Sequence, residues 1–346
     1  MVSKSITIKD IAKALNISCS TVSRALKDSY RISKPVKEIV KEYARKHNYR
    51  PNLMAQSLKN KKSRSIGISL CSIPNSFFAE VISGMESVAY DKDYKIIITQ
   101  SFESLEREVK NIEHLAWHAV DGILVSLSTE TTDTTHLKKL HENGIPIVFF
   151  DRISDQINTH TVTVDNKQGA SDATMHLLQE GFKNIAHITS SPELSITKER
   201  LEGYYEAIDA NKFTPNQDYI KYCMHGGMLY EEVEQAINEL FSLAEPPDAI
   251  IAASDRITLH TVSVLKKKEI RIPSQVALIG FSNFSAPDII EPSLTTIKQP
   301  AFDMGKKAME LLIQLIEAKR PVKYFEKIVL PAELEIRESS IKKGSL

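Results

Sequence analysis

The stretch TIKDIAKALNISCSTVSRAL, residues 7–26, predicts two short helices joined by a tight turn. Thr7 and Asp10 have the spacing of a capping box, which opens the first helix. Ser18 is a favourable N-cap for the second helix, Cys19–Leu26, because its side-chain oxygen can accept a hydrogen bond from a backbone N–H. Two helices joined in this way form a helix-turn-helix. Their apolar residues recur at helical spacing and form the expected buried stripes: Ile8, Ile11, Ala12, Leu15, Val22, Ala25 and Leu26.

A third helix is predicted to follow Ser33. Pro35 fits its first turn, where a missing backbone N–H breaks no hydrogen bond, and Asn48 marks its end. The three helices make the first 64 residues a folded head, not a bare basic tail. The apolar stripe predicted for the third helix consists of Val36, Ile39, Val40, Tyr43 and Ala44.

The outer face of the second helix suits the major groove of DNA. Its short polar side chains allow close approach, and their donors and acceptors can match base edges. Arg24 can offer a bidentate pair to a guanine, which is worth ~1–3 kcal/mol of discrimination. Ser18, Thr21 and Ser23 can donate to the phosphates beside the groove. Cys19 lies on this face as well, although a lone cysteine is more often a small buried residue, and a redox-sensing thiol is a further alternative.

The charge distribution supports a nucleic-acid partner for the head. Residues 1–64 contain 16 Lys and Arg against 4 Asp and Glu, whereas the remaining 282 residues contain 28 against 40. A short basic module on a long acidic body is typical of a polyanion-binding head. A solvated basic tail is the alternative that charge alone leaves open.

Composition restricts the class of protein. A chain of 346 residues is too long for one core and suits two or three domains. No apolar run approaches the ~20 residues of a membrane span, and the first residues lack the apolar region of a secretory signal. Cys19, Cys71 and Cys223 are an odd, scattered set, which argues against a disulfide framework and favours a reducing cytoplasm.

The head resembles the DNA-binding domain of the LacI/GalR (lactose-repressor) family. The resemblance rests on TIKDIAKALNISCSTVSRAL and on RISKPVKEIVKEYARKHNYRPNLMAQSLK, residues 31–59, and runs without gaps from Thr7 to about Lys59. It implies that Cys19, Ser20 and Arg24 read bases. The phosphate contacts expected for the whole head come from Thr7, Ser18, Thr21, Ser23, Arg31, Ser33 and Asn52.

The segment Asn52–Leu58 is predicted to be a hinge helix. About two turns are too short to be stable alone in water, so we expect order only when DNA and a second copy pack on it. The resemblance implies that Ala55 and Leu58 enter the minor groove, where Leu58 from each copy wedges between bases and kinks the operator. The alternative is a leucine that only packs in the linker or dimer.

Beyond the linker Lys59–Ser65, short apolar runs alternate with amphipathic stretches. This alternation predicts parallel sheets covered by helices on both faces, and its length predicts two similar subdomains. The expected strands are Ile66–Cys71, Ile96–Thr99, Gly122–Ser126, Pro146–Phe150, Ile185–Thr189, Ala249–Ala253 and Val276–Phe281. The expected helices include Phe77–Tyr90, Glu106–His118, Gln168–Glu180, Glu199–Asn211, Glu231–Leu243 and Leu259–Lys267.

The body resembles the effector domain of the same family, which is similar to periplasmic sugar-binding proteins of type I. The matching segments are IPNSFFAEVISGME, VDGILVS, IPIVFFDR, VTVDNKQGA, KERLEGYYEAI, DAIIAASD, VALIGFSNF and PSLTTIKQP. The resemblance implies two doubly wound α/β lobes joined by three crossings, near 163, 293 and 323. The expected domains are a head at 1–50, a hinge and linker at 51–65 and an effector domain at 66–338. Lobe N would hold 66–163 and 294–323, and lobe C 164–293 and 324–338.

Candidate effector-binding residues follow from family positions at the carboxyl ends of strands. Phe77 or Phe78 would stack on a sugar ring unless both belong to the core. Asp151 would accept hydroxyl hydrogens, and Arg200 would bind the ligand unless it forms a structural salt bridge. The remaining candidates are Ser254, Asp255, Ser282 and Asn283, of which Asp255 is more readily read as a helix cap.

Two departures from the family bear on the ligand. Many relatives carry paired acids where this chain has Ser282 and Asn283, and an Asn is common where Ser254 stands. Because a neutral pair tolerates a more acidic ligand, one hypothesis is a sugar acid or a sugar phosphate. The identity of the sugar-type effector stays open.

The sequence contains no set of residues that suits metal binding or catalysis. His114 and His118 have a spacing that can hold zinc, but they lack further ligands and are interpreted as a surface pair. No Gly-rich phosphate loop and no nucleophile elbow occurs, so neither an enzyme nor a cofactor is expected. Two competing classes are a transport-type sugar receptor, which predicts a signal segment and no head, and an architectural DNA-binding protein with an inert body.

The sequence thus predicts a cytoplasmic transcription regulator, most simply a repressor, that binds a pseudo-palindromic operator as a homodimer. A small sugar-type effector between the lobes would control it. Residues 338–346 show no leucine heptads, so a tetramerising coiled coil is not expected, while tetramers through other surfaces stay open.

The hinge interpretation predicts that Leu58→Ala reduces the bend of the bound operator, because the wedge that unstacks the central step is lost. The bend angle can be measured by fluorescence transfer across a labelled operator. Ser57→Ala serves as the control. An unchanged angle in Leu58→Ala would mean that Leu58 only packs within the hinge.

Overall fold

The computed structural model describes residues 6–49, 62–284 and 286–342. The chain divides into two compact units, a head over Met1–Ser63 and a body over Arg64–Leu346. Three residues expected to contact DNA, Asn52, Ala55 and Leu58, lie outside the described ranges. Within those ranges, no helix combines the length and apolar character of a membrane span.

Over residues 6–49, the head is a bundle of three helices around a small apolar core. It contains α1 (Ile8–Ala14), α2 (Cys19–Leu26) and α3 (Lys34–Lys46). The capping box at Thr7 is present as predicted, and Ser18 accepts a hydrogen bond from the backbone of Thr21 at the start of α2. The tight turn after α1 has Asn16 in the left-handed region, with φ 51°. The buried core residues are Ile11, Ala12, Val22, Ala25, Val40 and Ala44.

One residue of the predicted α3 stripe is wrong. Ile39 is 55 % exposed, whereas Val40 is fully buried. Consecutive helical residues are separated by about 100° around the axis, so the stripe centred on Val40 and Ala44 leaves Ile39 at its edge.

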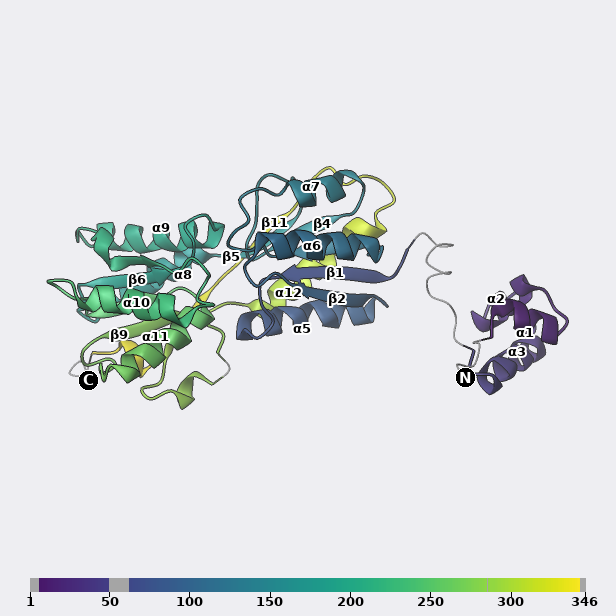
Figure 1. Ribbon diagram of the computed structural model, residues 1–346, viewed down its shortest axis with the longest axis horizontal. Coiled ribbons are helices and arrows are strands. Elements are labelled where there is room, and N and C mark those ends of the chain that lie inside the picture. The colour runs from purple at the N-terminus through teal and green to yellow at the C-terminus, as the bar shows by residue number, and fades with distance from the viewer. Residues whose placement is uncertain (1–5, 50–61, 285, 343–346) are drawn as a thin grey trace. The chain divides into compact units, whose positions relative to one another are not determined.

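The body consists of two α/β lobes, each built on a six-stranded sheet (Figure 1). The sheets are parallel except for β12, which pairs antiparallel with β10. In spatial order, the first sheet contains β11 (Lys327–Leu330), β5 (Thr161–Val164), β4 (Ile147–Phe150), β3 (Gly122–Val125), β1 (Ser65–Leu70) and β2 (Lys95–Gln100). The second contains β12 (Glu333–Glu335), β10 (Thr295–Lys298), β9 (Ala277–Phe281), β8 (Ala249–Ala252), β6 (Ile185–Thr189) and β7 (Ile220–Tyr222).

Helices cover both faces of each sheet, as the alternating pattern predicted. In lobe N, one face packs on α5 (Ser76–Asp91) and α12 (Ala301–Glu317), and the other on α6 (Leu105–Trp117) and α7 (Thr135–Glu142). In lobe C, one face packs on α8 (Asn166–Gln179) and α9 (Ser195–Ala210), and the other on α10 (Tyr230–Phe241) and α11 (Asp255–Lys267). Short 3₁₀ turns occupy Gln217–Tyr219, Pro287–Ile289 and Glu338–Ser340.

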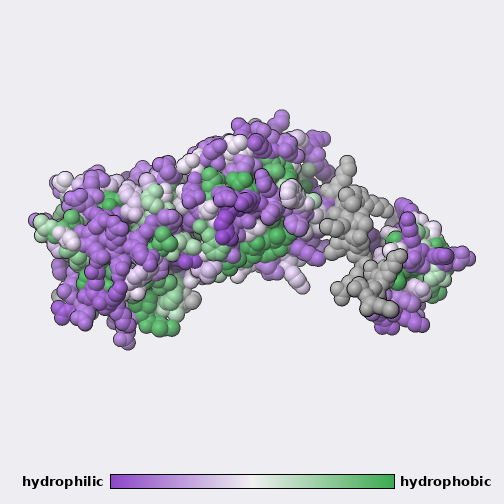
Figure 2. Space-filling view, in the orientation of Figure 1, coloured by the Kyte–Doolittle hydropathy of each residue, from purple (hydrophilic) through white to green (hydrophobic). Residues whose placement is uncertain are grey.

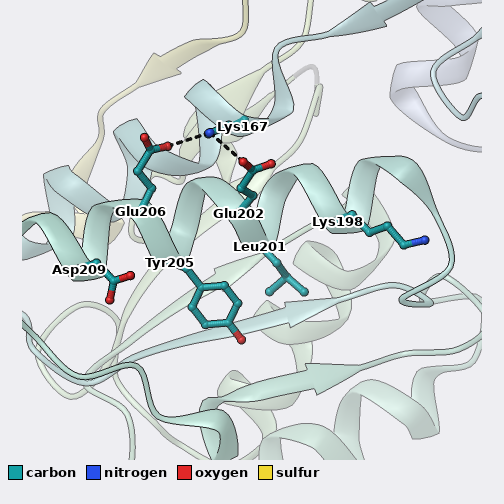
Figure 3. A pocket seen from close by; sticks show the side chains of 7 residues that line it. All are labelled: Lys167, Lys198, Leu201, Glu202, Tyr205, Glu206 and Asp209. Atoms are coloured by element: carbon teal, nitrogen blue, oxygen red, sulfur yellow. Dashed lines mark hydrogen bonds and ion pairs between the residues drawn. The ribbon is translucent and has the colours of Figure 1, made fainter.

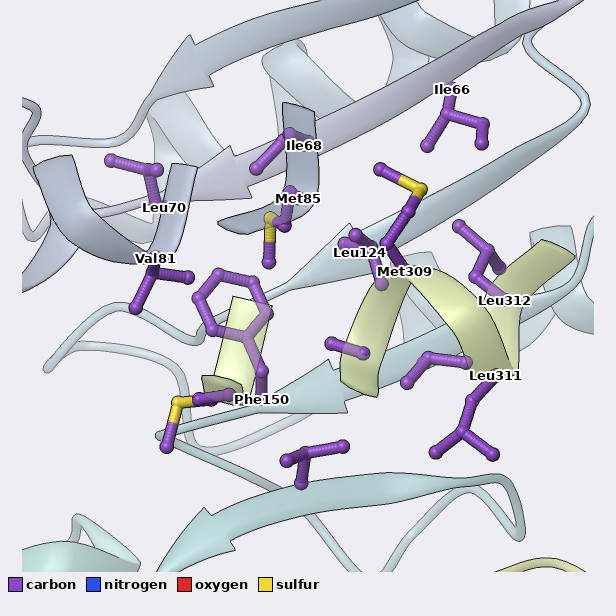
Figure 4. Packing of buried hydrophobic residues seen from close by; sticks show 14 of the residues in the cluster. Ile66, Ile68, Leu70, Val81, Met85, Leu124, Phe150, Met309, Leu311 and Leu312 are labelled. Atoms are coloured by element: carbon purple, nitrogen blue, oxygen red, sulfur yellow. The ribbon is translucent and has the colours of Figure 1, made fainter. Parts of the chain in front are cut away.

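The visible face of the body is mostly hydrophilic, with hydrophobic residues gathered in a few patches (Figure 2). The apolar strands are buried between the helical layers instead. In Figure 4, side chains of β1, β3 and β4 meet those of α5 and α12 in a single cluster.

Two of the three expected crossings between the lobes are wrong by several residues. The first lies between β5 and α8, close to the expected 163. The second lies between β10 and α12, after 293, because β10 continues the ladder of β9 in lobe C. The third lies between β11 and β12, after 323, because β11 pairs with β5 in lobe N. The expectation assigned residues 294–323 to lobe N and 324–338 to lobe C without identifying either short strand, since positions taken by analogy contain no pairing information.

Close packing of α5 on α12 depends on two glycines. A Cβ on Gly84 would lie 2.0 Å from the carbonyl oxygen of Phe302, and one on Gly305 would lie 2.0 Å from that of Val81. Both obstacles are backbone atoms, which cannot move aside as a flexible side chain can. The helices can therefore approach this closely only without side chains at these positions.

We predict that Gly84→Ala destabilises the body, although alanine favours a helix over glycine by about 1 kcal/mol. Overpacking against the carbonyl of Phe302 should outweigh that gain and lower the free energy of unfolding by ~1–3 kcal/mol. Denaturant unfolding measures the effect, with the exposed Glu86→Ala on the same helix as control. A Gly84→Ala variant as stable as the wild type would show that the helices separate at little cost.

Candidate nucleic-acid interface and interlobe site

The outer face of α2 presents the three predicted base-reading residues to solvent. Cys19, Ser20 and Arg24 are all exposed, so Cys19 is not the buried residue of the alternative interpretation. Arg24 lies in the last turn of α2. The face therefore offers a guanidinium beside two short side chains, which allows close approach to base edges.

The hydroxyls around α2 are partly committed within the head. The Oγ of Ser18 lies 2.8 Å from those of both Ser20 and Thr21, and Thr7 donates to Asp10 at 2.7 Å. Among the other predicted phosphate contacts, Ser23 is half-buried, while Arg31 and Ser33 are exposed. The Nε of Arg31 donates to Tyr30 at 3.1 Å.

Two lysines of α3 hold the loop that follows α2. Lys41 on α3 contacts the Asp28 carboxylate at 2.7 Å, and the Lys37 ammonium donates to the Asp28 carbonyl oxygen at 3.0 Å. The hydrogen bond from Lys41 lowers the pKa of Asp28 below its usual value. These contacts tie the end of the exposed α2 face to the third helix.

In the body, the predicted effector residues gather where strands of the two lobes end. Arg200 on α9 is buried, and its three nitrogens donate to Asn166 Oδ1 at 2.8 Å, the Ala253 carbonyl oxygen at 2.6 Å and Gln299 Oε1 at 3.2 Å. The guanidinium also lies 4.1 Å from the centre of the Phe281 ring. Burial lowers the pKa of Arg200 to about 10, while Asp151 and Glu199 oppose that shift. Arg200 therefore stays charged at neutral pH. Among the described residues it forms no direct salt bridge, which was the structural alternative for this arginine.

Asp151 follows β4 and belongs to a buried charged cluster in lobe N. Its carboxylate accepts a hydrogen bond from Ser126 at 3.3 Å and lies 3.9 Å from the Nε of Arg152. Burial raises the pKa of Asp151, and Arg152 and Arg200 offset part of that rise. Arg152 in turn donates to the Glu103 carboxylate at 2.7 Å.

Asp255 connects the two lobes. One carboxylate oxygen accepts hydrogen bonds from Ser282 Oγ at 2.6 Å and from the Asn283 backbone at 2.9 Å, both in lobe C. The other accepts from the backbone N–H of Phe77 at 3.2 Å, in the first turn of α5 in lobe N. N–H groups of a first helical turn have no partner within the helix, so a carboxylate is favourable there. The cap expected of Asp255 is made by Ser254, which accepts from Ile257 at 3.2 Å.

Two neighbours of Asp255 also bridge the lobes. Arg256 donates to Ser72 Oγ at 2.7 Å and to the Pro74 carbonyl oxygen at 3.2 Å. Asn283 donates to the Glu80 carboxylate at 2.9 Å. With Asp255, these residues form an interlobe latch, defined as Asp255, Arg256 and Asn283 on lobe C with their partners on lobe N.

Phe77 and Phe78 are buried in the core of lobe N. Their rings meet edge to face at 5.2 Å between centroids, and Phe78 also meets Phe150 at 6.3 Å. The structure thus places both rings in the packing of α5. Of these two residues, Phe77 also bonds to the opposite lobe, through its backbone N–H and not through its ring.

Other features of the body lie away from these strand ends. A cavity of about 660 Å³ lies along α8 and α9, where Lys167 bridges Glu202 and Glu206 at 2.9 and 3.2 Å (Figure 3). Its lining is mostly charged side chains on open helix surface. His114 and His118 are both exposed, and within residues 6–49, 62–284 and 286–342 no cluster suits a metal ion.

Sequence reasoning missed Glu103, Arg152, Gln299 and Arg256. Glu103 and Gln299 follow the ends of β2 and β10, and ligand residues are expected just after the carboxyl ends of strands. The strand before Glu103 was predicted to end one residue too early, and the strand before Gln299 was not predicted. Arg152 stands directly after Asp151 in FFDR, and Arg256 directly after Asp255. Adjacency in the sequence was the available signal for both.

Comparisons with known proteins agree with both parts of the chain. Residues 7–52 match the family model described as bacterial regulatory proteins, lacI family, and residues 63–335 match that of periplasmic binding proteins and sugar binding domain of LacI family. The ribose operon repressor of Halalkalibacterium halodurans is 31 % identical over 96 % of this chain and 97 % of its own length.

Two solved structures extend the similarity. The transcriptional regulator CelR–cellobiose complex superposes with a TM-score of 0.72 at 26 % identity, covering 96 % of this chain and 99 % of that one. The lac repressor dimer bound to operator and the anti-inducer ONPF gives a TM-score of 0.82 at 22 % identity, covering 98 % and 100 %. The latter match concerns the fold alone.

The latch predicts that Asp255→Asn loosens the lobes. An amide cannot accept all three hydrogen bonds, and its NH₂ group would face a backbone N–H, so the closed arrangement should lose ~1.5–3 kcal/mol. Hydrogen exchange at the start of α5 measures this loss and should accelerate. Ser254→Ala is the matched control, since it removes only the cap of α11. Equal acceleration at α5 in both variants would contradict the role given to Asp255.

Proposed function

The chain belongs to the LacI family of bacterial regulatory proteins, and on that premise we propose that it represses transcription from an operator under the control of a sugar-type effector. The observation that carries the proposal is the exposed α2 face on the same chain as a two-lobed body with polar groups at the strand ends. The first is suited to read DNA, and the second to bind a small ligand.

DNA recognition is assigned to α2. Arg24 would bond a guanine while Cys19 and Ser20 contact neighbouring bases, and hydroxyl and basic side chains of the head would hold phosphates. A homodimer would present two such helices to the halves of a pseudo-palindromic operator. Because lysines and arginines displace counterions, affinity should fall steeply with salt.

Effector control is assigned to the contact between the lobes. Arg200 and Asp151 belong to opposite lobes, and the latch holds the lobes together through direct hydrogen bonds. A ligand that bonds groups of both lobes changes the equilibrium between closed and open forms, and through it the spacing of two heads in a dimer. The names of relatives support a sugar, since one is a ribose operon repressor and another is solved with cellobiose.

A transport-type receptor is the other function that such a body could serve. The DNA-binding head counts against it, because a receptor needs no basic helix-turn-helix. Since the family consists of regulators, we propose no catalytic activity and no cofactor. A regulator of this kind acts where the DNA is, in the cytoplasm.

We predict that Arg24→Ala removes much of the preference for operator over random DNA, while weakening non-specific binding much less. Loss of one bidentate base contact removes ~1–3 kcal/mol of discrimination. Titration of labelled operator and random DNA at one salt concentration gives both affinities. Arg45→Ala, which removes an exposed arginine from the last turn of α3, is the matched control. Equal losses on the two DNAs would contradict base reading by Arg24.

A further inference from the structure

The polar walls between the lobes already contain more anions than cations. Four carboxylates lie at or near the strand ends, of which three are buried and Glu199 is half-buried. Two buried guanidinium groups, Arg152 and Arg200, oppose them, and the interlobe latch adds one half-buried group of each sign, Arg256 and Glu80. The carboxylates are those of Glu103, Asp151, Glu199 and Asp255.

Both guanidinium groups are committed to the protein. Arg200 donates from each of its three nitrogens to an oxygen of Asn166, Ala253 or Gln299. Arg152 donates through one nitrogen to Glu103 at 2.7 Å and to the Leu127 carbonyl oxygen at 3.3 Å. Burial opposes the charge of Arg152, but Glu103 and Asp151 outweigh it and raise its pKa. The charge of Arg152 is therefore paired with Glu103, while each nitrogen of Arg200 already donates to a neutral oxygen, so a phosphate or a carboxylate would have to compete with these contacts.

Further contacts fix the position of Glu103 beside Arg152. Its carboxylate also accepts from the backbone of Thr129 at 2.9 Å, and its own φ of 64° lies in the left-handed region. Its other oxygen points to lobe C, where it would lie 3.0 Å from a Cβ on Gly226. A residue that neutralises Arg152 thus stands at the boundary between the lobes.

The polar atoms left over suit a ligand without charge. Ser190 Oγ lies on the lobe C side of Gly226, 3.5 Å from the same Cβ position. It is buried and, like the Nε of Arg152, makes no hydrogen bond to the described residues. Buried polar atoms without partners are unfavourable, and hydroxyl groups, which both donate and accept, would satisfy them and the Glu103 carboxylate.

We infer that the interlobe site takes an uncharged polyhydroxy effector and rejects its phosphorylated and carboxylated derivatives, with Glu103 as the residue that determines this specificity. The inference rests on the proposed function, in that the effector is sugar-type. It departs from the sequence-based hypothesis of an acidic ligand, because the loss of carboxylates at Ser282 and Asn283 is compensated by Glu103 and Asp255.

The test uses the full chain and matched sets of sugars: ribose, ribose 5-phosphate and ribonate, then glucose, glucose 6-phosphate and gluconate. Thermal unfolding and calorimetric titration report binding, since a ligand of the native state raises the melting temperature. In at least one set, the uncharged sugar should bind the wild type at least ten times more tightly than the corresponding sugar phosphate and sugar acid.

A variant tests the assigned residue. Glu103→Gln frees Arg152, so it should bind the sugar phosphate at least tenfold more tightly than the wild type does. Inorganic phosphate should stabilise this variant and leave the wild type unchanged. Glu113→Gln removes the same charge from an exposed site on α6 and should behave as the wild type. The wild-type comparison needs no variant and stands even if Glu103→Gln does not fold.

The outcomes separate the inference from the proposed function. A sugar phosphate or acid that binds the wild type as tightly as its parent overturns the inference and leaves a sugar-type effector in place. A folded Glu103→Gln that gains no affinity for phosphate overturns the role of Glu103. No response to any sugar or derivative would remove the proposed effector class and the inference together.

Discussion

The carboxylate of Asp255 is the contact on which the geometry between the lobes depends. It fixes Ser282 and the backbone of Asn283 on its own lobe and reaches the first turn of α5 on the other. A single acidic side chain therefore positions the end of β9 and the start of α5 together. Arg256 and Asn283 extend the same joint to Ser72 and Glu80. The hydrogen bonds are direct, so the closed form has a defined geometry that a ligand can favour or oppose.

The buried charges beside this joint stabilise one another. Arg152 would be costly to bury without Glu103, and Arg200 depends on neutral oxygens from three separate segments. Removing one partner leaves an uncompensated charge, which is more unfavourable than losing both. The polar groups between the lobes thus form a connected set, and the specificity of the site is a property of that set.

The sequence was sufficient for the elements whose signals are local. The bounds of α2 were predicted from Ser18 and from the spacing of Val22, Ala25 and Leu26, because capping and helical period act within a few residues. The strands β10 and β11 were not recognised, and the residues that form them were assigned to the wrong lobes, because their place depends on partners far along the chain. Glu103 was missed although it closely follows a predicted strand, since its importance appears only beside Arg152. Cap assignment failed at Ser254 and Asp255, where either residue could begin the helix.

The three crossings between the lobes also affect the order in which the chain can fold during synthesis. The head is continuous in sequence over its described residues, so it can fold soon after it leaves the ribosome. Lobe N cannot, because α5 packs on α12 and β5 pairs with β11, and both partners are made only after most of lobe C. At ~5–20 residues per second, the apolar face of α5 waits on the order of ten seconds or more for its partner helix. The nascent body therefore exposes an unfinished surface that chaperones can bind, long after the DNA-binding head has formed.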